Sequence, residues 1–251
     1  MKQQLQPVIA ELQHWRDQGL TLPLWWRDDD AIAPTAALGR LLALAEGLDA
    51  PLHLAVIPRP AEAALADRLQ ESANVYAMPH GWQHQNHAPP EEKKAEFGAH
   101  RPTHVMLDEI ARGWRRIEHM FGQRALPVFV PPWNRVSPAV VDGLARCGFA
   151  AVSGFLPRQT KYPSPNLLQV NTHLDPIAWR SGGGLKDPAA LAAGIVALLA
   201  DRRAERTDNS EPFGLLTHHL VHDDDIWSFV GTLVETLLAS GVCEWTPPLG
   251  G

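Results

Sequence analysis

The sequence contains few cysteines and no long apolar run. Cys147 and Cys243 are its only cysteines, which is too few for a disulfide scaffold and suits a reducing compartment. It has no run of apolar residues of the roughly 18 that a transmembrane helix needs. Its first residues are polar and amphipathic, unlike a secretory signal peptide. We therefore expect a cytoplasmic protein with no membrane span.

The sequence also lacks a concentration of charge of one sign. Its 22 basic and 28 acidic residues are mixed along the chain and give a net charge of −6. Without a basic stripe, nucleic acid is not an expected partner. Hydrophobic residues make up 45% of the 251 residues, which is ample for one core. We expect residues 1–251 to form a single domain.

Short apolar runs alternate with helical patterns along the chain. The expected strands lie at 20–26, 51–57, 74–78, 126–130, 149–155, 167–170 and 213–220. The expected helices lie at 33–48, 61–69, 104–122, 137–148, 187–205 and 224–240. This alternation favours a parallel α/β fold, and about seven such units in one chain favour a (β/α) barrel over an open sheet.

The unusual polar residues follow the ends of these strands. The first strand runs into Asp28-Asp29-Asp30, the third into His80 and His84, and the late strand into His218. The fourth strand runs into the sequence Pro-Pro-Trp-Asn-Arg at 131–135. Because ligands bind at the carboxyl ends of parallel strands, we expect these side chains to meet at one rim of the barrel.

The aspartates and histidines together indicate a metal site. Three adjacent carboxylates raise one another's pKa, and a helix amino terminus would account for one of them at most, Asp30 being the candidate. A divalent cation would relieve the repulsion. His80 and His84 share one face of a helical turn, and one Asp with two His is a common set of ligands for zinc. Cobalt, nickel, manganese and iron suit the same ligands.

These motifs, in this order, resemble those of the polysaccharide deacetylase family with the NodB-homology fold, a distorted (β/α) barrel. The family's T-F-D-D-G is similar to Trp-Arg-Asp-Asp-Asp at 26–30, and its H-[ST]-x-x-H to His-Gly-Trp-Gln-His at 80–84. Its R-x-P-[YFW]-G is similar to Val-Pro-Pro-Trp-Asn at 130–134, and its L-x-H to Leu-Thr-His at 216–218. The resemblance spans residues 25–219, nearly the whole chain.

The resemblance implies a role for each matching residue. Asp29, His80 and His84 become the metal ligands, Asp28 the catalytic base and His218 the catalytic acid. A bound divalent metal acidifies its water, to a pKa of about 7 for zinc, and polarises the carbonyl group of the substrate. The base takes the proton of the attacking water, and the acid protonates the departing amine or alkoxide.

Some positions depart from the family pattern. Val130 stands where the third motif has the arginine that orients the base, and we expect Arg135 to replace it, with Arg27 as the competitor. Gly81 stands where Ser or Thr is usual, so a hydroxyl that would support a neighbouring loop is absent. The fourth motif has only Asp175 and Trp179 as remnants.

The remaining candidates lie within or beside the motifs. Trp82, Pro132 and Trp133 are expected to bind substrate, the tryptophans by stacking on a sugar face. His219 alternates with His218 along the strand and is expected to be a hydrogen-bonded packing residue. The polar segment 85–101 is either a lid over the site or a solvated surface loop.

We therefore expect a metal-dependent hydrolase that removes an acetyl group from an N-acetylated sugar or related amide by cleaving a carbon–nitrogen bond other than a peptide bond. Its substrate would be a small molecule or an oligosaccharide. Two alternatives stay open: hydrolysis of a non-sugar amide or cyclic imide, and a non-catalytic relative that binds metal or carbohydrate.

Overall fold

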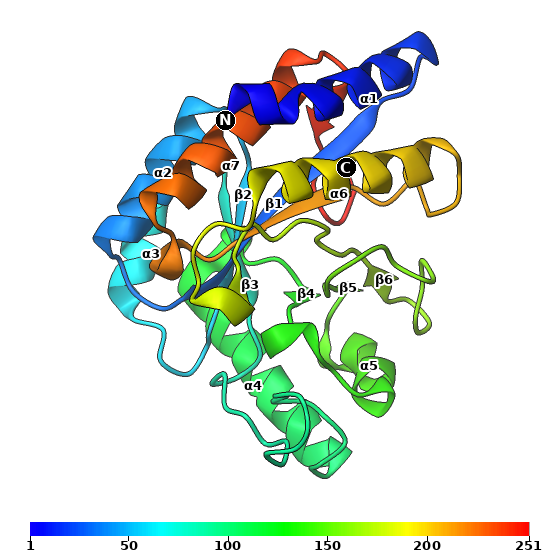
Figure 1. Ribbon diagram of the computed structural model, residues 1–251. Helices are drawn as coiled ribbons and strands as arrows, with labels where there is room; N and C mark the ends of the chain where they lie inside the picture. Colours follow the sequence, from blue (N-terminus) through cyan, green and yellow to red (C-terminus); the bar gives the residue numbers. More distant parts are fainter. Residues whose placement is uncertain (251) are drawn as a thin grey trace.

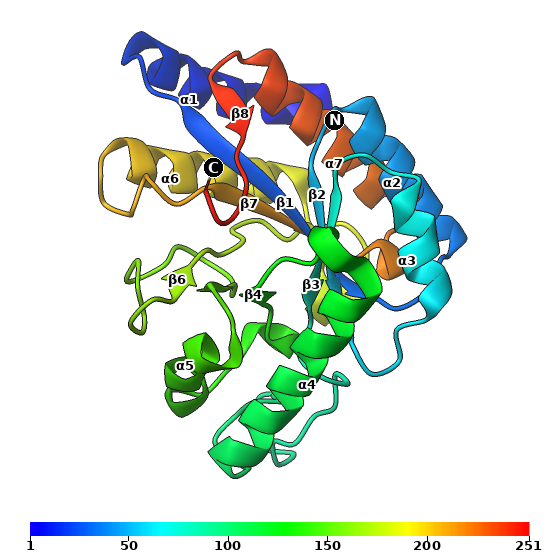
Figure 2. The same ribbon diagram turned by 180° about the vertical axis from the view of Figure 1, so that it is seen from behind.

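Parallel strands occupy the centre of the fold and helices cover their outside (Figures 1 and 2). The computed structural model describes residues 1–250. The strands are β1 (Leu22–Ala31), β2 (Leu52–Val56), β3 (Val75–Pro79), β4 (Val128–Phe129), β5 (Ala151–Val152), β6 (Leu168–Gln169), β7 (Phe213–Thr217) and β8 (Cys243–Trp245). The helices are α1 (Gln6–Asp17), α2 (Ala36–Gly47), α3 (Ala63–Gln70), α4 (Thr103–Phe121), α5 (Pro138–Leu144), α6 (Pro188–Arg203) and α7 (Asp224–Ala239).

The strands form two parallel sheets that meet at their edges. One has the order β3-β2-β1-β7, with β8 also paired to β1, and the other has the order β4-β5-β6. A bridge between His80 and Val130 joins the end of β3 to the end of β4. A bridge between Leu174 and Leu215 joins the segment after β6 to β7. The expected distorted barrel of about seven parallel strands is therefore confirmed.

The elements lie close to the positions that the sequence predicts, with two additions at the ends of the chain. The first is α1, which was not predicted and which buries Val8, Leu12 and Trp15. The second is β8, a short strand of three residues that pairs with the first part of β1. Within residues 1–250, no helix is both long enough and apolar enough to cross a membrane.

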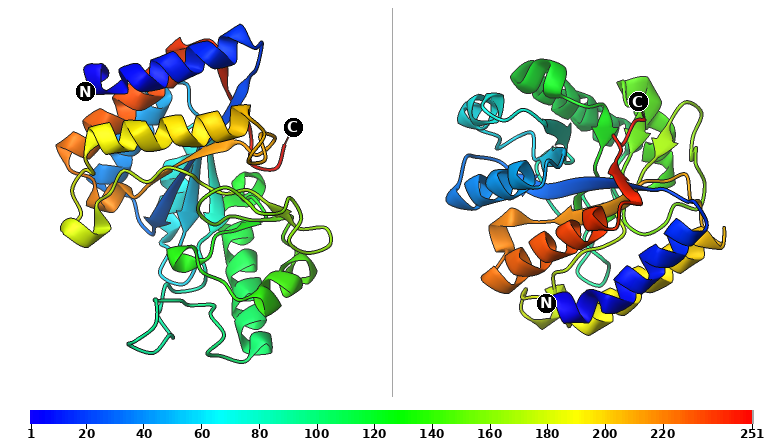
Figure 3. Two further views of the ribbon diagram at one scale, coloured as in Figure 1. Left: turned by 45° about the vertical axis from the view of Figure 1, so that its right-hand side comes forward. Right: turned by 90° about the horizontal axis from the view of Figure 1, so that it is seen from above.

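Helices ring the strands (Figure 3). Apolar side chains of both form the core between them. Trp15 and Trp26 belong to the main core with side chains from α1, α2, α6 and α7. A second cluster beneath α4 and α5 includes Phe97, Phe129 and Phe149. These two clusters hold the strand ends, and hence the loops that follow them, in fixed positions.

The end of β1 departs from regular pairing. Asp28 lies opposite Leu54 of β2, but Ala31 lies opposite Val56, so two residues of β1 face one residue of β2. This is a β-bulge, and within it the backbone of Asp30 has a φ of 74°, in the left-handed region. A bulge redirects side chains, so the aspartates after Asp28 do not follow the simple alternation of a strand.

Candidate metal centre and catalytic groups

One carboxylate and two imidazoles converge at the carboxyl ends of β1 and β3. The Nε2 atoms of His80 and His84 lie 3.3 and 3.4 Å from the same Oδ1 atom of Asp30. Their potential ligand atoms all lie within 4.8 Å of one another. Within residues 1–250 this is the one such grouping of three or more His, Cys, Asp or Glu side chains. Asp30 thus takes the place that the sequence assigned to Asp29.

His80 is held in one tautomer by the backbone of the neighbouring strand. Its ring is almost fully buried, and its Nδ1–H donates to the carbonyl oxygen of Val130 at 3.0 Å. Since a carbonyl group can only accept, Nδ1 carries a proton, and Nε2 is the nitrogen that faces Asp30 and could bind a cation once it is deprotonated. Metal-binding histidines are usually oriented in this way by a hydrogen bond from their other nitrogen.

His84 is held by an aromatic neighbour. Its backbone has a φ of 58°, and its ring lies 4.2 Å, centroid to centroid, from the ring of Trp133. Trp133 itself has a φ of 56° in the short turn Pro132–Asn134 that follows β4. Trp133 therefore contacts a member of the cluster, whereas the sequence predicted a contact with substrate.

The charges of the cluster are strongly coupled. Burial by itself would raise the pKa of Asp30, but the hydrogen bond with His80 and the charges of His80, His84 and His218 hold that pKa well below its usual range. Burial opposes protonation of His80, yet the carboxylates of Asp29 and Asp30 raise its pKa above the ordinary value. The site therefore attracts positive charge, which suits a divalent cation.

Asp29 forms a buried ion pair with Arg27. The two guanidinium nitrogens Nε and Nη2 lie 2.8 Å from Oδ1 and 3.0 Å from Oδ2 of Asp29. Arg27 is fully buried and also donates to Asn134 Oδ1 at 2.7 Å and to Ser153 Oγ at 2.7 Å. This two-point contact fixes the orientation of the carboxylate.

Arg135 forms no hydrogen bond or ion pair with Asp28 or Asp29, although the sequence led us to expect that it orients the base, Asp28. It follows the turn after β4, and its Nη1 donates to the backbone oxygen of Lys94 at 2.8 Å. Arg27 can reach Asp29 because it lies on the same strand, two residues earlier. Arg27, the competitor named from the sequence, is therefore the arginine that pairs with an aspartate of this strand, although with Asp29 and not with Asp28.

His218 approaches Asp29 from the end of β7. Its Nε2 lies 4.0 Å from Asp29 Oδ2, and its side chain is 13% exposed. The ring of Trp179 meets it edge-on at 4.8 Å, and Trp179 Nε1 donates to Asp175 Oδ2 at 2.7 Å. The two remnants of the fourth motif are thus connected to the histidine that the sequence named as the acid.

Asp28 is enclosed, which corrects its expected role as a base. It is fully buried, and its Oδ2 accepts from Thr217 Oγ1 at 2.6 Å and from the backbone N–H of His219 at 3.0 Å. Its Oδ1 lies 2.5 Å from Nδ1 of His219. Neither oxygen is available to a substrate. As expected, His219 is a buried, hydrogen-bonded histidine, here bound to Asp28.

Trp82 and Pro132, which the sequence assigned to substrate binding, both make packing contacts within the protein. The guanidinium of Arg112 on α4 lies 5.3 Å from the centroid of the Trp82 ring, which packs against the second core cluster. Pro132 is buried, and a Cβ atom added to Gly81 would lie 2.6 Å from its ring. Trp82 thus anchors the turn at 80–84 to the core, and Pro132 packs against Gly81 of the same turn.

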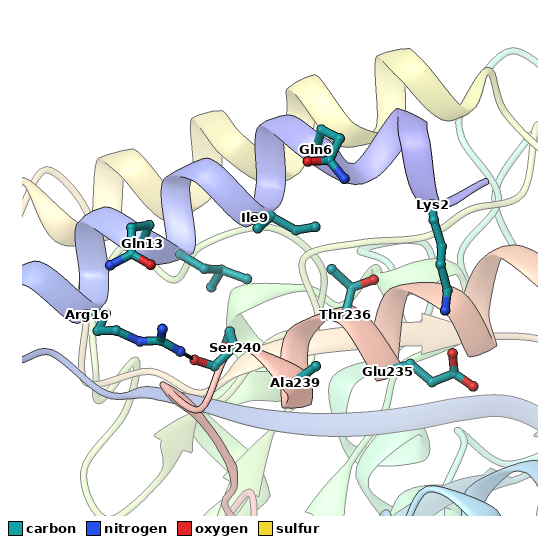
Figure 4. Close-up of a pocket in the computed structure, with 10 residues that line it drawn as sticks. Lys2, Gln6, Ile9, Gln13, Arg16, Glu235, Thr236, Ala239 and Ser240 are labelled. Atoms are coloured by element: carbon teal, nitrogen blue, oxygen red, sulfur yellow. Dashed lines mark hydrogen bonds between the residues drawn. The ribbon is translucent and has the colours of Figure 1, made fainter.

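A separate groove lies between α1 and α7 (Figure 4). Its volume is about 480 Å³, and Ile9, Gln13, Glu235 and Thr236 are among the residues that line it. Arg16 closes one end by donating to the backbone oxygen of Ser240. The groove is formed by helix surfaces and does not include the ends of β1, β3 or β7.

Comparison with solved structures identifies the fold as that of the family 4 carbohydrate esterases. One neighbour is a family 4 carbohydrate esterase from Streptomyces lividans in complex with acetate, with a TM-score of 0.55, 14% identity, and coverage of 90% of this chain and 92% of that one. A polysaccharide deacetylase from Bacillus cereus has a TM-score of 0.54, 16% identity, and coverage of 89% and 90%.

The same fold also occurs without activity. A pseudoenzyme of this family from Bacillus anthracis has a TM-score of 0.55 and 14% identity, with coverage of 90% of this chain and 63% of that one. No family model matches the sequence, and no curated protein is similar to it. At these identities the likeness establishes the fold, and function must be argued from the site.

The enclosed Asp28 should matter for stability. Replacing Asp28 by Ala removes the partner of a buried histidine and of two further donors, and we expect a loss of about 3–5 kcal/mol in the free energy of unfolding. Chemical denaturation measures this loss. Asp224→Ala is the matched control, because it removes an aspartate whose ion pair with Arg40 is exposed and should change stability little. Equal stability of the two variants would contradict the enclosed role of Asp28.

Proposed function

We propose that this chain, which has the fold of the family 4 carbohydrate esterases, is a metal-dependent hydrolase that removes an acetyl group from an N-acetylated sugar or related amide. One observation carries the proposal: Asp30, His80 and His84 converge beside a second carboxylate, Asp29, and a second imidazole, His218. A binding site for metal alone would have no need of the last two.

Asp30, His80 and His84 have the chemistry of a divalent metal site. Two imidazole nitrogens and one carboxylate oxygen suit zinc, cobalt, nickel, manganese or iron and leave positions for water and substrate. The hydrogen bond from His80 to Val130 supports this assignment, because it leaves Nε2 free to bind. When bound, such a cation lowers the pKa of water towards neutral and polarises a carbonyl group.

Asp29 is the proposed base. Arg27 holds it in one orientation, and it directly precedes Asp30 in the chain. It takes a proton from the water that attacks the acetyl carbon. The arginine that supports it, Arg27, lies on β1, and not in the turn after β4 where the sequence led us to expect it.

His218 is the proposed acid. Its Nε2 lies 4.0 Å from Asp29 Oδ2, and its side chain is 13% exposed. The edge-on contact with Trp179 holds its ring. It gives a proton to the nitrogen as the carbon–nitrogen bond breaks, so that acetate and a free amine leave. Asp175, which accepts from Trp179, keeps the indole in place and thereby orients His218.

The same groups would also hydrolyse a non-sugar amide or a cyclic imide. Trp82 and Pro132 pack into the protein, which leaves fewer side chains to stack on a sugar and favours keeping this second candidate. Release of acetate from a panel of N-acetylated sugars, alongside ring opening of cyclic imides, separates the two. Bound metal without turnover on either panel would instead favour a non-catalytic relative.

The proposed ligands can be tested by metal content. We expect Asp30→Ala, His80→Ala and His84→Ala each to weaken metal affinity by more than the roughly 10–100-fold that a supporting residue contributes. Metal analysis after dialysis measures the effect. Asp29→Asn is the control and should keep its metal, since Asp29 is paired with Arg27. Metal lost from the Asp29 variant and kept by the Asp30 variant would show that the ligand is Asp29.

The proposed base and acid should affect turnover and leave metal binding intact. We expect Asp29→Asn and His218→Ala to lower the rate by about 10²–10⁴, the usual contribution of proton transfer. Rates are measured on metal-loaded protein with the substrate that the panel identifies. His219→Ala tests the neighbouring position and should reduce stability rather than the chemical step. Near-normal turnover in the Asp29 or His218 variant would remove that residue from the mechanism.

The two arginines can be ranked by the same substitution. Lysine cannot reproduce the two-point contact of Arg27 with Asp29, so Arg27→Lys should lower kcat/KM by about tenfold or more, because hydrogen bonds to charged groups contribute about 1.5–3 kcal/mol. Arg135→Lys should change kcat/KM little, since Arg135 contacts only a backbone oxygen of a surface segment. A larger effect at Arg135 would restore the assignment made from the sequence.

A further inference from the structure

The turn that presents the two histidines has an unusual backbone. Gly81 and His84 have φ values of 62° and 58°, both in the left-handed region. The backbone N–H groups of the three successive residues 82–84 point to one place. There they meet the carboxylate of Glu96, with N–O distances of 3.2 Å from Trp82, 2.9 Å from Gln83 and 3.2 Å from His84. Successive amides of this kind form a concave site for an anion.

Glu96 comes from the segment that directly follows the turn. It is fully buried, although it belongs to the polar segment 85–101. The side-chain oxygen of Asn86 accepts from Ala88 and Ala95 at 3.1 and 2.9 Å, which closes the segment into a loop just before Glu96. Phe97, the next residue, is fully buried in the second core cluster. The segment therefore supports the turn from within, whereas the sequence suggested a lid or a surface loop.

Gly81 leaves free the space that the carboxylate of Glu96 occupies. A Cβ atom on Gly81 would lie 2.2 Å from Oε2 of Glu96, closer than real Cβ contacts come. The carboxylate therefore occupies the space that a Ser or Thr side chain would need at this position. The absence of a hydroxyl group at position 81 therefore goes together with the buried carboxylate at position 96.

We propose that Glu96 is a positioning residue of the metal centre, holding His84 in place through the backbone of the turn; this rests on the proposed function. Buried amides need an acceptor, so without Glu96 the turn must rearrange to bring three N–H groups to water. His80 has its own support from Val130, at the end of β3. His84 lies beyond the end of the strand, so apart from the ring contact with Trp133 its place depends on the turn.

Cobalt binding to Glu96→Gln and Glu96→Ala tests the proposal. Calorimetry gives the affinity of the full-length protein for Co²⁺, and the visible absorption of the bound ion reports its ligand geometry. We expect affinity to fall about 10–100-fold, as for other residues that support metal ligands, with an altered spectrum. In the metal-free protein we expect hydrogen exchange at the amides of residues 82–84 to become faster. The near-isosteric glutamine serves if the alanine variant folds poorly.

Glu109→Gln is the matched control. Glu109 forms an ion pair of 2.7 Å with Arg101 at the end of the same segment and does not touch the turn, so affinity and spectrum should stay as in the wild type. Wild-type affinity in both folded Glu96 variants overturns the proposal, whether or not exchange is faster. If the unmodified protein binds no cobalt, the proposed function fails, and amide exchange alone then decides whether Glu96 holds the turn.

Discussion

The bulge at the end of β1 is the constraint on which the rest of the site depends. Up to Asp28 the strand pairs regularly between β2 and β7, and regular pairing would point successive side chains to opposite faces. One extra residue and a left-handed backbone at Asp30 break that alternation. As a result Asp28 stays inside the barrel, while Asp29 and Asp30 both reach its mouth. Two consecutive carboxylates can then serve two different partners.

Each of the three carboxylates is stabilised by a different source of positive charge or hydrogen bonds. Asp28 accepts from Thr217 and His219, and Asp29 is paired with Arg27. Asp30 faces two imidazoles and has a depressed pKa, which is the environment expected beside a cation. Burial would otherwise penalise all three charges. The repulsion among the three carboxylates suggested one metal ion, but each carboxylate has its own partner.

The histidine turn depends on residues that lie outside it in the sequence. Val130 orients His80 through its backbone oxygen, and Trp133 packs against the ring of His84. Glu96 binds the amides between the two histidines. None of these three residues belongs to the grouping of potential metal ligands. They show how a site whose motif is incomplete in sequence can still be held in place by packing and backbone hydrogen bonds.

The sequence by itself determined the order of strands and helices, the barrel, and the segments that meet at its mouth, because these follow from apolar periodicity and from the ends of parallel strands. The tertiary structure alone decided which aspartate joins His80 and His84, because the position of a bulge depends on pairing with β2. It also decided between Arg27 and Arg135, since reach in space is not distance in sequence. Glu96 carried no signal in sequence: a glutamate in a charged segment reads as solvated, and only folding buries it against three amides.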